Sequence, residues 1–67
     1  MIRGYRGFKI DAKRGKTLLG ANCVYYTVRR VGESPVWLNG CLDSPGATVW
    51  EVIGMLKRLI DKSLDEQ

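Results

Sequence analysis

The residues Gly15-Lys16-Thr17 have the composition of a phosphate-binding loop, in which backbone N–H groups and a lysine cradle phosphates. That motif requires a second glycine five residues before Gly15, and Ile10 occupies this position. The motif also leads into a helix, whereas the residues that follow here have the composition of a strand. We therefore interpret this segment as a basic turn.

The other reactive side chains are two cysteines, Cys23 and Cys41, and seven scattered carboxylates. Because the chain has no histidine, the thiols lack the usual proton acceptor of a nucleophilic site, and two thiolates alone do not complete a zinc site. The cysteines are too few for a disulfide framework and do not form a C-x-x-C pair. We expect two buried or half-buried thiols in a reducing compartment. The sequence predicts no catalytic residue, no metal, no cofactor and no enzymatic activity.

Length and composition indicate one small globular domain spanning residues 1–67. Hydrophobic residues make up 45% of the chain and charged residues 27%, which is typical of folded domains, so we expect fraying only at residues 65–67. No apolar run approaches the roughly 20 residues that span a bilayer. Arg3 and Arg6 are not followed by the apolar segment of a secretory signal. We predict a cytoplasmic protein that does not bind membranes.

The net charge of +4 is concentrated near the N-terminus. Residues 1–16 hold six basic side chains against Asp11 alone, whereas the rest of the chain is nearly balanced. A segment of this kind attracts phosphate groups or an acidic protein surface, although in many proteins it is only a solvated strand and turn. The candidate phosphate contacts are Lys13, Arg14 and Lys16.

Residues 49–64 have the pattern of an amphipathic helix. Thr48 and Glu51 form the S/T-x-x-E capping box that begins such a helix, and Ser44-Pro45-Gly46 delivers the chain to it. Gly54 lies in the helix interior, either as a tolerated glycine or as a place where another surface approaches closely. Apolar residues recur at spacings of three and four, which places them on one helical face: Val49, Val52, Ile53, Leu56, Leu59, Ile60 and Leu64.

Three segments before the helix have the composition of strands, namely Tyr5–Ala12, Cys23–Val31 and Val36–Leu42. Residues 13–22 leave two alternatives open, a hairpin around Arg14-Gly15 or a longer loop with two leucines beneath the helix. We predict an α+β fold in which a three-stranded antiparallel sheet carries one C-terminal amphipathic helix on one face (β-β-β-α).

The second and third strands are expected to pair through a turn at Gly32-Glu33-Ser34. This turn would place Val28 opposite Leu38, Tyr26 opposite Gly40 and Arg29 opposite Trp37, so that each face keeps its own chemistry.

One helix covers one face of a sheet, so the other face is the candidate interaction surface. Exposed aromatic residues grouped with basic ones form a platform on which nucleic-acid bases stack, and they are also enriched in protein interfaces. Arg29 beside Trp37 would form a cation–π pair on this face. Alternation along the strands assigns the following residues to it: Tyr5, Lys9, Tyr25, Thr27, Arg29, Trp37, Asn39 and Cys41.

The chain resembles small uncharacterised phage and prophage proteins of ββ(β)α type. The resemblance rests on Tyr5-Arg6-Gly7-Phe8-Lys9-Ile10, on Tyr26-Thr27-Val28, and on the helical segment from Thr48 to Asp61. It implies a non-enzymatic accessory role, such as modulation of a host protein, and brings no functional residues with it.

Two functional hypotheses follow. The first is a small protein-interaction module that uses the open sheet face, with a homodimer among the candidate assemblies. The second is a nucleic-acid-binding protein whose basic residues contact phosphates while Tyr25 and Trp37 stack on bases.

Overall fold

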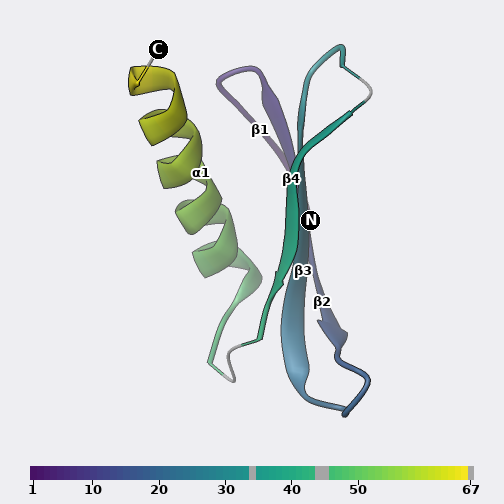
Figure 1. The fold of residues 1–67 in the computed structure, drawn as a ribbon. Coiled ribbons are helices and arrows are strands. Elements are labelled where there is room, and N and C mark those ends of the chain that lie inside the picture. The colour runs from purple at the N-terminus through teal and green to yellow at the C-terminus, as the bar shows by residue number, and fades with distance from the viewer. Residues whose placement is uncertain (34, 44–45, 67) are drawn as a thin grey trace.

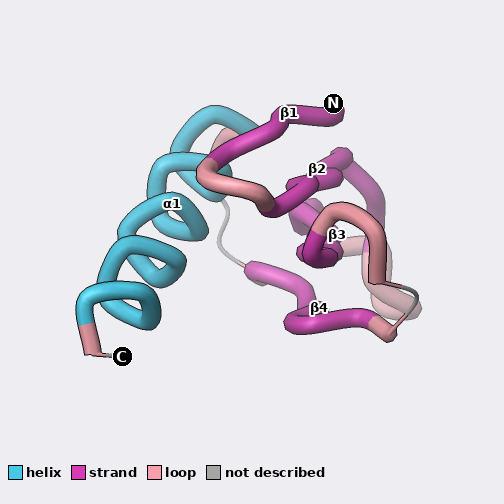
Figure 2. Tube along the Cα trace, turned by 90° about the horizontal axis from the view of Figure 1, so that it is seen from above, coloured by secondary structure: helices cyan, strands magenta, loops and turns pink. Residues whose placement is uncertain are grey.

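The computed structural model describes residues 1–33, 35–43 and 46–66. Four strands precede one helix, and their bounds are β1 Ile2–Tyr5, β2 Phe8–Lys16, β3 Asn22–Arg30, β4 Val36–Leu42 and α1 Val49–Asp65. The strands form a single antiparallel sheet in the order β1-β2-β3-β4, and α1 lies against one face of it (Figures 1 and 2). This arrangement confirms an α+β fold with an antiparallel sheet and a C-terminal helix. Within the described residues, no helix has the length and apolar character required to cross a membrane.

The prediction of three strands is wrong, because the segment expected as the first strand begins in a hairpin. Tyr5 pairs with Phe8, and the two residues between them form a tight turn. Both have positive φ angles, 47° for Arg6 and 84° for Gly7, as a two-residue type I′ turn requires. The chain therefore folds back on itself here, and residues 2–5 add a fourth strand along the edge of β2.

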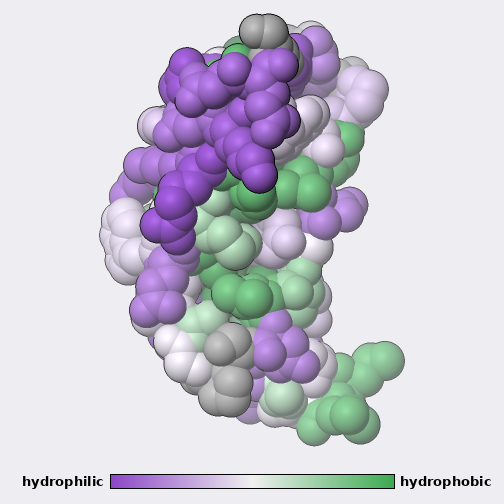
Figure 3. All heavy atoms as spheres, turned by 60° about the vertical axis from the view of Figure 1, so that its left-hand side comes forward, coloured by the Kyte–Doolittle hydropathy of each residue, from purple (hydrophilic) through white to green (hydrophobic). Residues whose placement is uncertain are grey.

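The segment after β2 forms a hairpin, but its turn lies at residues 17–21. The predicted hairpin around Arg14-Gly15 is wrong, because both residues lie within β2, opposite Val24 and Cys23. Lys16 pairs with Asn22, and the turn between them is closed by the Thr17 N–H, which donates to the Ala21 carbonyl oxygen over 2.9 Å. Leu18 and Leu19 stand at its tip with exposed fractions of 106% and 97%, so they do not lie beneath the helix. The tip is at the lower end of Figure 3, where hydrophobic atoms protrude.

The pairing of β3 with β4 follows the predicted register at two positions and departs from it at a third. Val28 lies opposite Leu38 and Tyr26 lies opposite Gly40, as expected. The register shifts beyond Val28, however, and Arg29 pairs with Val36, which leaves Trp37 as an extra residue of the bulge. The predicted turn at residues 32–34 includes Ser34, which is outside the described residues.

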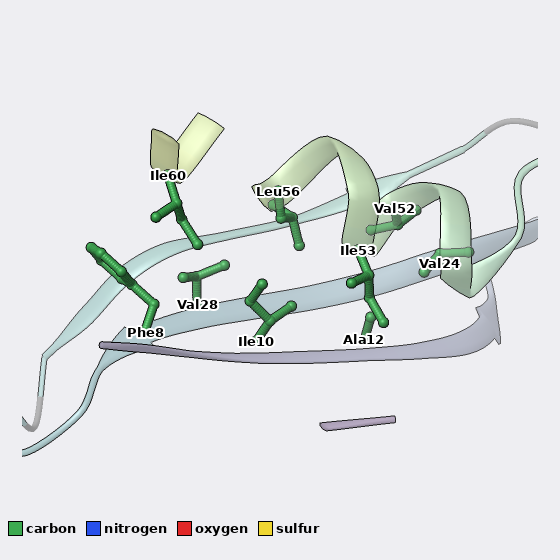
Figure 4. Packing of buried hydrophobic residues seen from close by; sticks show 9 residues of the cluster. All are labelled: Phe8, Ile10, Ala12, Val24, Val28, Val52, Ile53, Leu56 and Ile60. Carbon is green, nitrogen blue, oxygen red and sulfur yellow. The ribbon is translucent and has the colours of Figure 1, made fainter. Parts of the chain in front are cut away.

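The core lies between α1 and the helix-facing side of β2 and β3 (Figure 4). Alternate residues of these strands point toward the helix, whose buried side chains interdigitate with them, as the period of two in a strand and 3.6 in a helix requires. The buried cluster consists of Phe8, Ile10, Ala12, Val24, Val28, Val52, Ile53, Leu56 and Ile60.

The helix begins as the sequence predicts, because the Glu51 N–H donates to Thr48 Oγ1 over 3.1 Å. Leu59 differs from the expected apolar face, since it is 42% exposed. The helix continues to Asp65 and Glu66 caps it, whereas Gln67, like Ser44 and Pro45 of the expected approach to the cap, is outside the described residues.

Gly54 is the position at which a small substitution is expected to stabilise the fold. A Cβ atom added there meets no atom within 4 Å, so alanine fits without displacing a neighbour. Because glycine in a helix interior costs about 0.8–1.0 kcal/mol relative to alanine, Gly54→Ala should raise the free energy of unfolding by about 0.5–1 kcal/mol. Urea denaturation followed by circular dichroism measures this change. A lower free energy of unfolding would contradict it.

Candidate nucleic-acid interface

The sheet face that points away from α1 carries no structural element of the described chain (Figure 2). We call it the outer face. Its side chains come from alternate positions of all four strands, opposite in direction to the core residues. They are Ile2 on β1, Lys9, Asp11 and Lys13 on β2, Cys23, Tyr25, Thr27 and Arg29 on β3, and Val36, Asn39 and Cys41 on β4.

Basic side chains lie toward both ends of the outer face. Lys9 pairs directly with Arg29, and Lys13, four residues further along β2, pairs with Tyr25. A rise of about 3.3 Å per residue places the two ends roughly 13 Å apart. Like charges directly opposite each other in a sheet repel, so this pair concentrates positive charge at one end of the outer face.

Polar side chains that can donate or accept hydrogen bonds occupy the row between these cations. Asp11 pairs with Thr27, which in turn pairs with Asn39, so the three side chains cross the outer face on neighbouring strands. Adjacent strands are about 4.8 Å apart, and a row of this kind therefore spans roughly 10 Å. Asp11 is the one acidic side chain of the outer face.

Tyr25 lies flat on the outer face and is held in place. A Cβ atom at Gly15 would lie 2.5 Å from the Tyr25 ring, so the absence of a side chain at Gly15 is what allows the ring to lie there. Its hydroxyl donates to the Lys16 carbonyl oxygen over 3.0 Å. The neighbouring Cys23 thiol, chiefly by hydrogen bonding, raises the pKa of Tyr25, so the phenol stays protonated. The exposed face of a fixed ring is a surface for stacking.

Two residues assigned to the outer face from the sequence lie on the opposite side of the sheet, which corrects the prediction. Tyr5 pairs with Phe8 across the β1–β2 hairpin and so shares its helix-facing direction. Trp37 is turned to the same side by the bulge, and its ring centroid lies 4.9 Å from that of Phe8. The predicted pairing of Trp37 with Arg29 is therefore wrong.

The three predicted phosphate contacts do not share one face. Lys13 belongs to the outer face, whereas Arg14 and Lys16 alternate to the other side of the β2–β3 hairpin. All three are exposed, because this part of the hairpin extends beyond the helix. The hairpin therefore has cations on both faces.

The two cysteines are free thiols on the outer face, Cys23 buried and Cys41 exposed. Partial desolvation by its neighbours raises the pKa of Cys41, and hydrogen bonding to Cys23 raises it further, so the thiol stays protonated and is a weak nucleophile. Among the residues that the structure describes, there is no group of three or more side chains suited to hold a metal ion.

A polar cluster on the other side of the sheet joins the β1–β2 turn to the helix. The Tyr5 hydroxyl donates to the Asp61 carboxylate at 2.8 and 2.9 Å, and an Arg6 guanidinium N–H donates to the same carboxylate at 2.6 Å. Lys57 Nζ lies 5.3 Å from the centre of the Tyr5 ring. These contacts connect residues more than 50 positions apart and fix the added strand β1 against α1.

This cluster predicts an acid-sensitive contribution to stability. The hydrogen bond from Arg6, and then that from Tyr5, lower the pKa of Asp61 below its ordinary value of 3.8. A carboxylate whose pKa is lowered by folding stabilises the fold above its unfolded-state pKa and loses that effect as the pH falls through the folded value. Thermal denaturation of the wild type and of Asp61→Asn should give a constant difference in Tm above about pH 5 that shrinks below about pH 4. A difference independent of pH would contradict this role.

The sequence missed Asp11 and Thr27 as partners in one polar row. Their alternation with Ile10, Ala12 and Val28 places them outward, but only the observed register of β2 with β3 brings them together. No protein-family model, curated protein or solved structure matches the chain. The function is therefore argued from the geometry of the outer face.

Proposed function

We propose that the chain is a nucleic-acid-binding protein that places the outer face of its sheet against a DNA duplex. The observation that carries the proposal is the charge of this face: Lys9, Arg29 and Lys13 against Asp11 alone. The wider distribution of charge agrees with it, since residues 1–42 hold eight basic side chains against two acidic ones, whereas residues 43–67 hold five acidic against three basic. The sheet is thus the basic side of the molecule.

In our proposal the outer face lies against the major groove, which is about 12 Å wide. The two central strands of the four-stranded sheet, β2 and β3 with nine residues each, form the ribbon nearest the groove. In our proposal the cations near the two ends of the ribbon contact the phosphates that border the groove. Lys9 and Arg29 would contact one strand of the duplex and Lys13 the other.

The polar row is then positioned to contact base edges. A carboxylate accepts from the amino group of cytosine, an asparagine side chain forms two hydrogen bonds with adenine, and a threonine serves either role. Asp11, Thr27 and Asn39 supply these three chemistries side by side. Tyr25 would pack against the sugar-phosphate backbone beside the phosphate that Lys13 contacts.

A protein partner on the outer face has less support from the structure than from the sequence pattern. Two of the three aromatic residues on which that hypothesis depended, Tyr5 and Trp37, lie on the helix side. Tyr25 remains. An accessory role of the phage type stays a prediction.

The proposal is tested by fluorescence anisotropy with a labelled duplex and a labelled single strand over a series of salt concentrations. Three phosphate contacts predict that log K falls with log salt with a slope of about −2.7 for duplex. Lys13→Gln should reduce this slope by about 0.9, because one contact is lost. The matched control is Lys62→Gln, which removes the same charge from the exposed side of the helix and should leave the slope unchanged. No binding at low salt, or an equal effect of both substitutions, would contradict the proposal.

A further inference from the structure

The strand β4 is an open edge of the sheet. It is the last strand in the order, and among the described residues no backbone hydrogen bond outside its ladder with β3 involves it. Its seven residues, Val-Trp-Leu-Asn-Gly-Cys-Leu, include neither a charge nor a proline. Natural sheets protect such edges with charged residues, proline or a covering element, because the unpaired N–H and C=O groups readily pair with another strand. The other edge, β1, has four residues and carries Arg3.

The helix leaves the inner side of β4 incompletely covered. It packs mainly on β2 and β3, and Trp37, Leu38 and Leu42 of β4 are only partly buried. Lys57 and Asp61 lie on the flank of α1 that contacts the β1–β2 hairpin. The helical period of 3.6 residues places Leu59 on the other flank. Figure 3 shows hydrophobic atoms along this side of the molecule, between hydrophilic helix atoms and the sheet. We call these partly exposed side chains, Trp37, Leu38, Leu42 and Leu59, the apolar strip, and it lies directly beside the unpaired edge.

The distribution of charge favours a second copy of the chain as the occupant. Two molecules with a net charge of +4 repel each other overall, and most strongly where their basic strands meet. β4 is the one strand of the sheet without a charged residue, so two copies can approach there without opposing cations. An uncharged edge bordered by an apolar strip is complementary to the same edge of an identical molecule. This self-complementarity is what a two-fold symmetric interface requires.

We propose that two copies of the chain pair antiparallel through their β4 edges and form one continuous eight-stranded sheet. Pairing about Gly40 sets Leu38 of each copy opposite Leu42 of the other, on the side that carries the helices. Leu59 of each copy then lies against the edge of the other sheet, and the apolar strip is covered. This inference does not depend on nucleic-acid binding, because it uses a different edge and a different set of residues.

The oligomeric state tests the inference directly. Size-exclusion chromatography with light scattering over a range of concentrations should give a mass of twice the 7.5 kDa of one chain, falling toward 7.5 kDa on dilution. Leu59→Lys should weaken the dimer about tenfold or more, since it would bury an unpaired charge at the interface. The control Leu19→Lys makes the same substitution at the hairpin tip, where the leucine is fully exposed, and should leave the dimer intact. Circular dichroism establishes that both variants are folded.

A second measurement does not require a variant. Pairing protects the backbone amides of β4 that point away from β3, at the open edge. Their hydrogen exchange should therefore slow as the concentration of the wild type rises. A monomer at every concentration with fast β4 exchange would overturn the inference. It would also be overturned if Leu59→Lys and Leu19→Lys weakened the dimer equally. Slow β4 exchange that is independent of concentration in a monomer would also overturn it.

Discussion

Lys9→Glu is expected to weaken duplex binding by more than tenfold at low salt while leaving the protein as stable as the wild type, or more stable. The loss follows from counterion release, which makes each phosphate contact worth about tenfold near 50 mM salt, and a carboxylate at this position adds repulsion. The gain in stability follows from the register, because residue 9 lies directly opposite Arg29. An opposite-charge pair directly across two strands contributes roughly 0.2–1 kcal/mol.

These opposite effects separate binding from folding. Anisotropy titration measures the affinity, and urea denaturation measures the free energy of unfolding. The control Lys62→Glu introduces the same change of charge on the exposed side of α1 and should alter the affinity only slightly. Equal losses of affinity in both variants would show that net charge alone governs binding, and would contradict the assignment of the outer face.

Leu56→Ala is expected to destabilise the protein by about 2–5 kcal/mol, which is much of the roughly 3–10 kcal/mol available to a domain of this length. Leu56 is fully buried in the cluster between the helix and the sheet, with Ile10 and Val28 among its members. A thin two-layer core has few other side chains to fill the cavity. At about 4–8 °C per kcal/mol for a small domain, Tm should fall by at least about 8 °C.

The matched control is Leu59→Ala, one turn along the same helix. Because Leu59 is 42% exposed in a single copy, whereas Leu56 is fully buried, its truncation should cost about 1 kcal/mol, clearly less than that of Leu56, when measured at low protein concentration. Thermal denaturation followed by circular dichroism compares the two variants. Equal losses would mean that the helix does not pack on the sheet through the face described above.

The helix and much of the β3–β4 pairing could be predicted from the sequence because their signals are local. Thr48 and Glu51 mark the start of α1, and the apolar spacing marks its buried face. The alternation in β3 and β4 determines that Val28 faces Leu38, since a slip by one residue would turn every apolar side chain outward.

The first strand and the bulge could not be predicted in the same way. An Arg-Gly pair is a weak signal for a type I′ turn, which usually has Asn or Asp before the glycine. The sequence therefore predicts one strand where the structure has β1, a turn and β2. A bulge leaves no periodic signature, because it shifts the alternation by one residue at a single point.

These two features explain the outcome for the candidate surface. Lys9, Tyr25, Arg29 and Asn39 come from regular stretches of strand, and their outward direction is confirmed. The assignments of Tyr5, beside the hairpin turn, and Trp37, at the bulge, are wrong. The position of Leu18 and Leu19 depended on whether residues 13–22 form a hairpin, which their composition leaves open.

The central claim, that the outer face binds nucleic acid, is tested most directly by NMR titration of the ¹⁵N-labelled protein with a short duplex at low salt. The account predicts that the amide resonances of the outer-face residues Lys9, Lys13, Thr27 and Arg29 shift with added duplex. The resonances of Arg58 and Lys62, on the exposed side of α1, should remain in place. Shifts confined to the helix, or no shifts at low salt, would contradict the account.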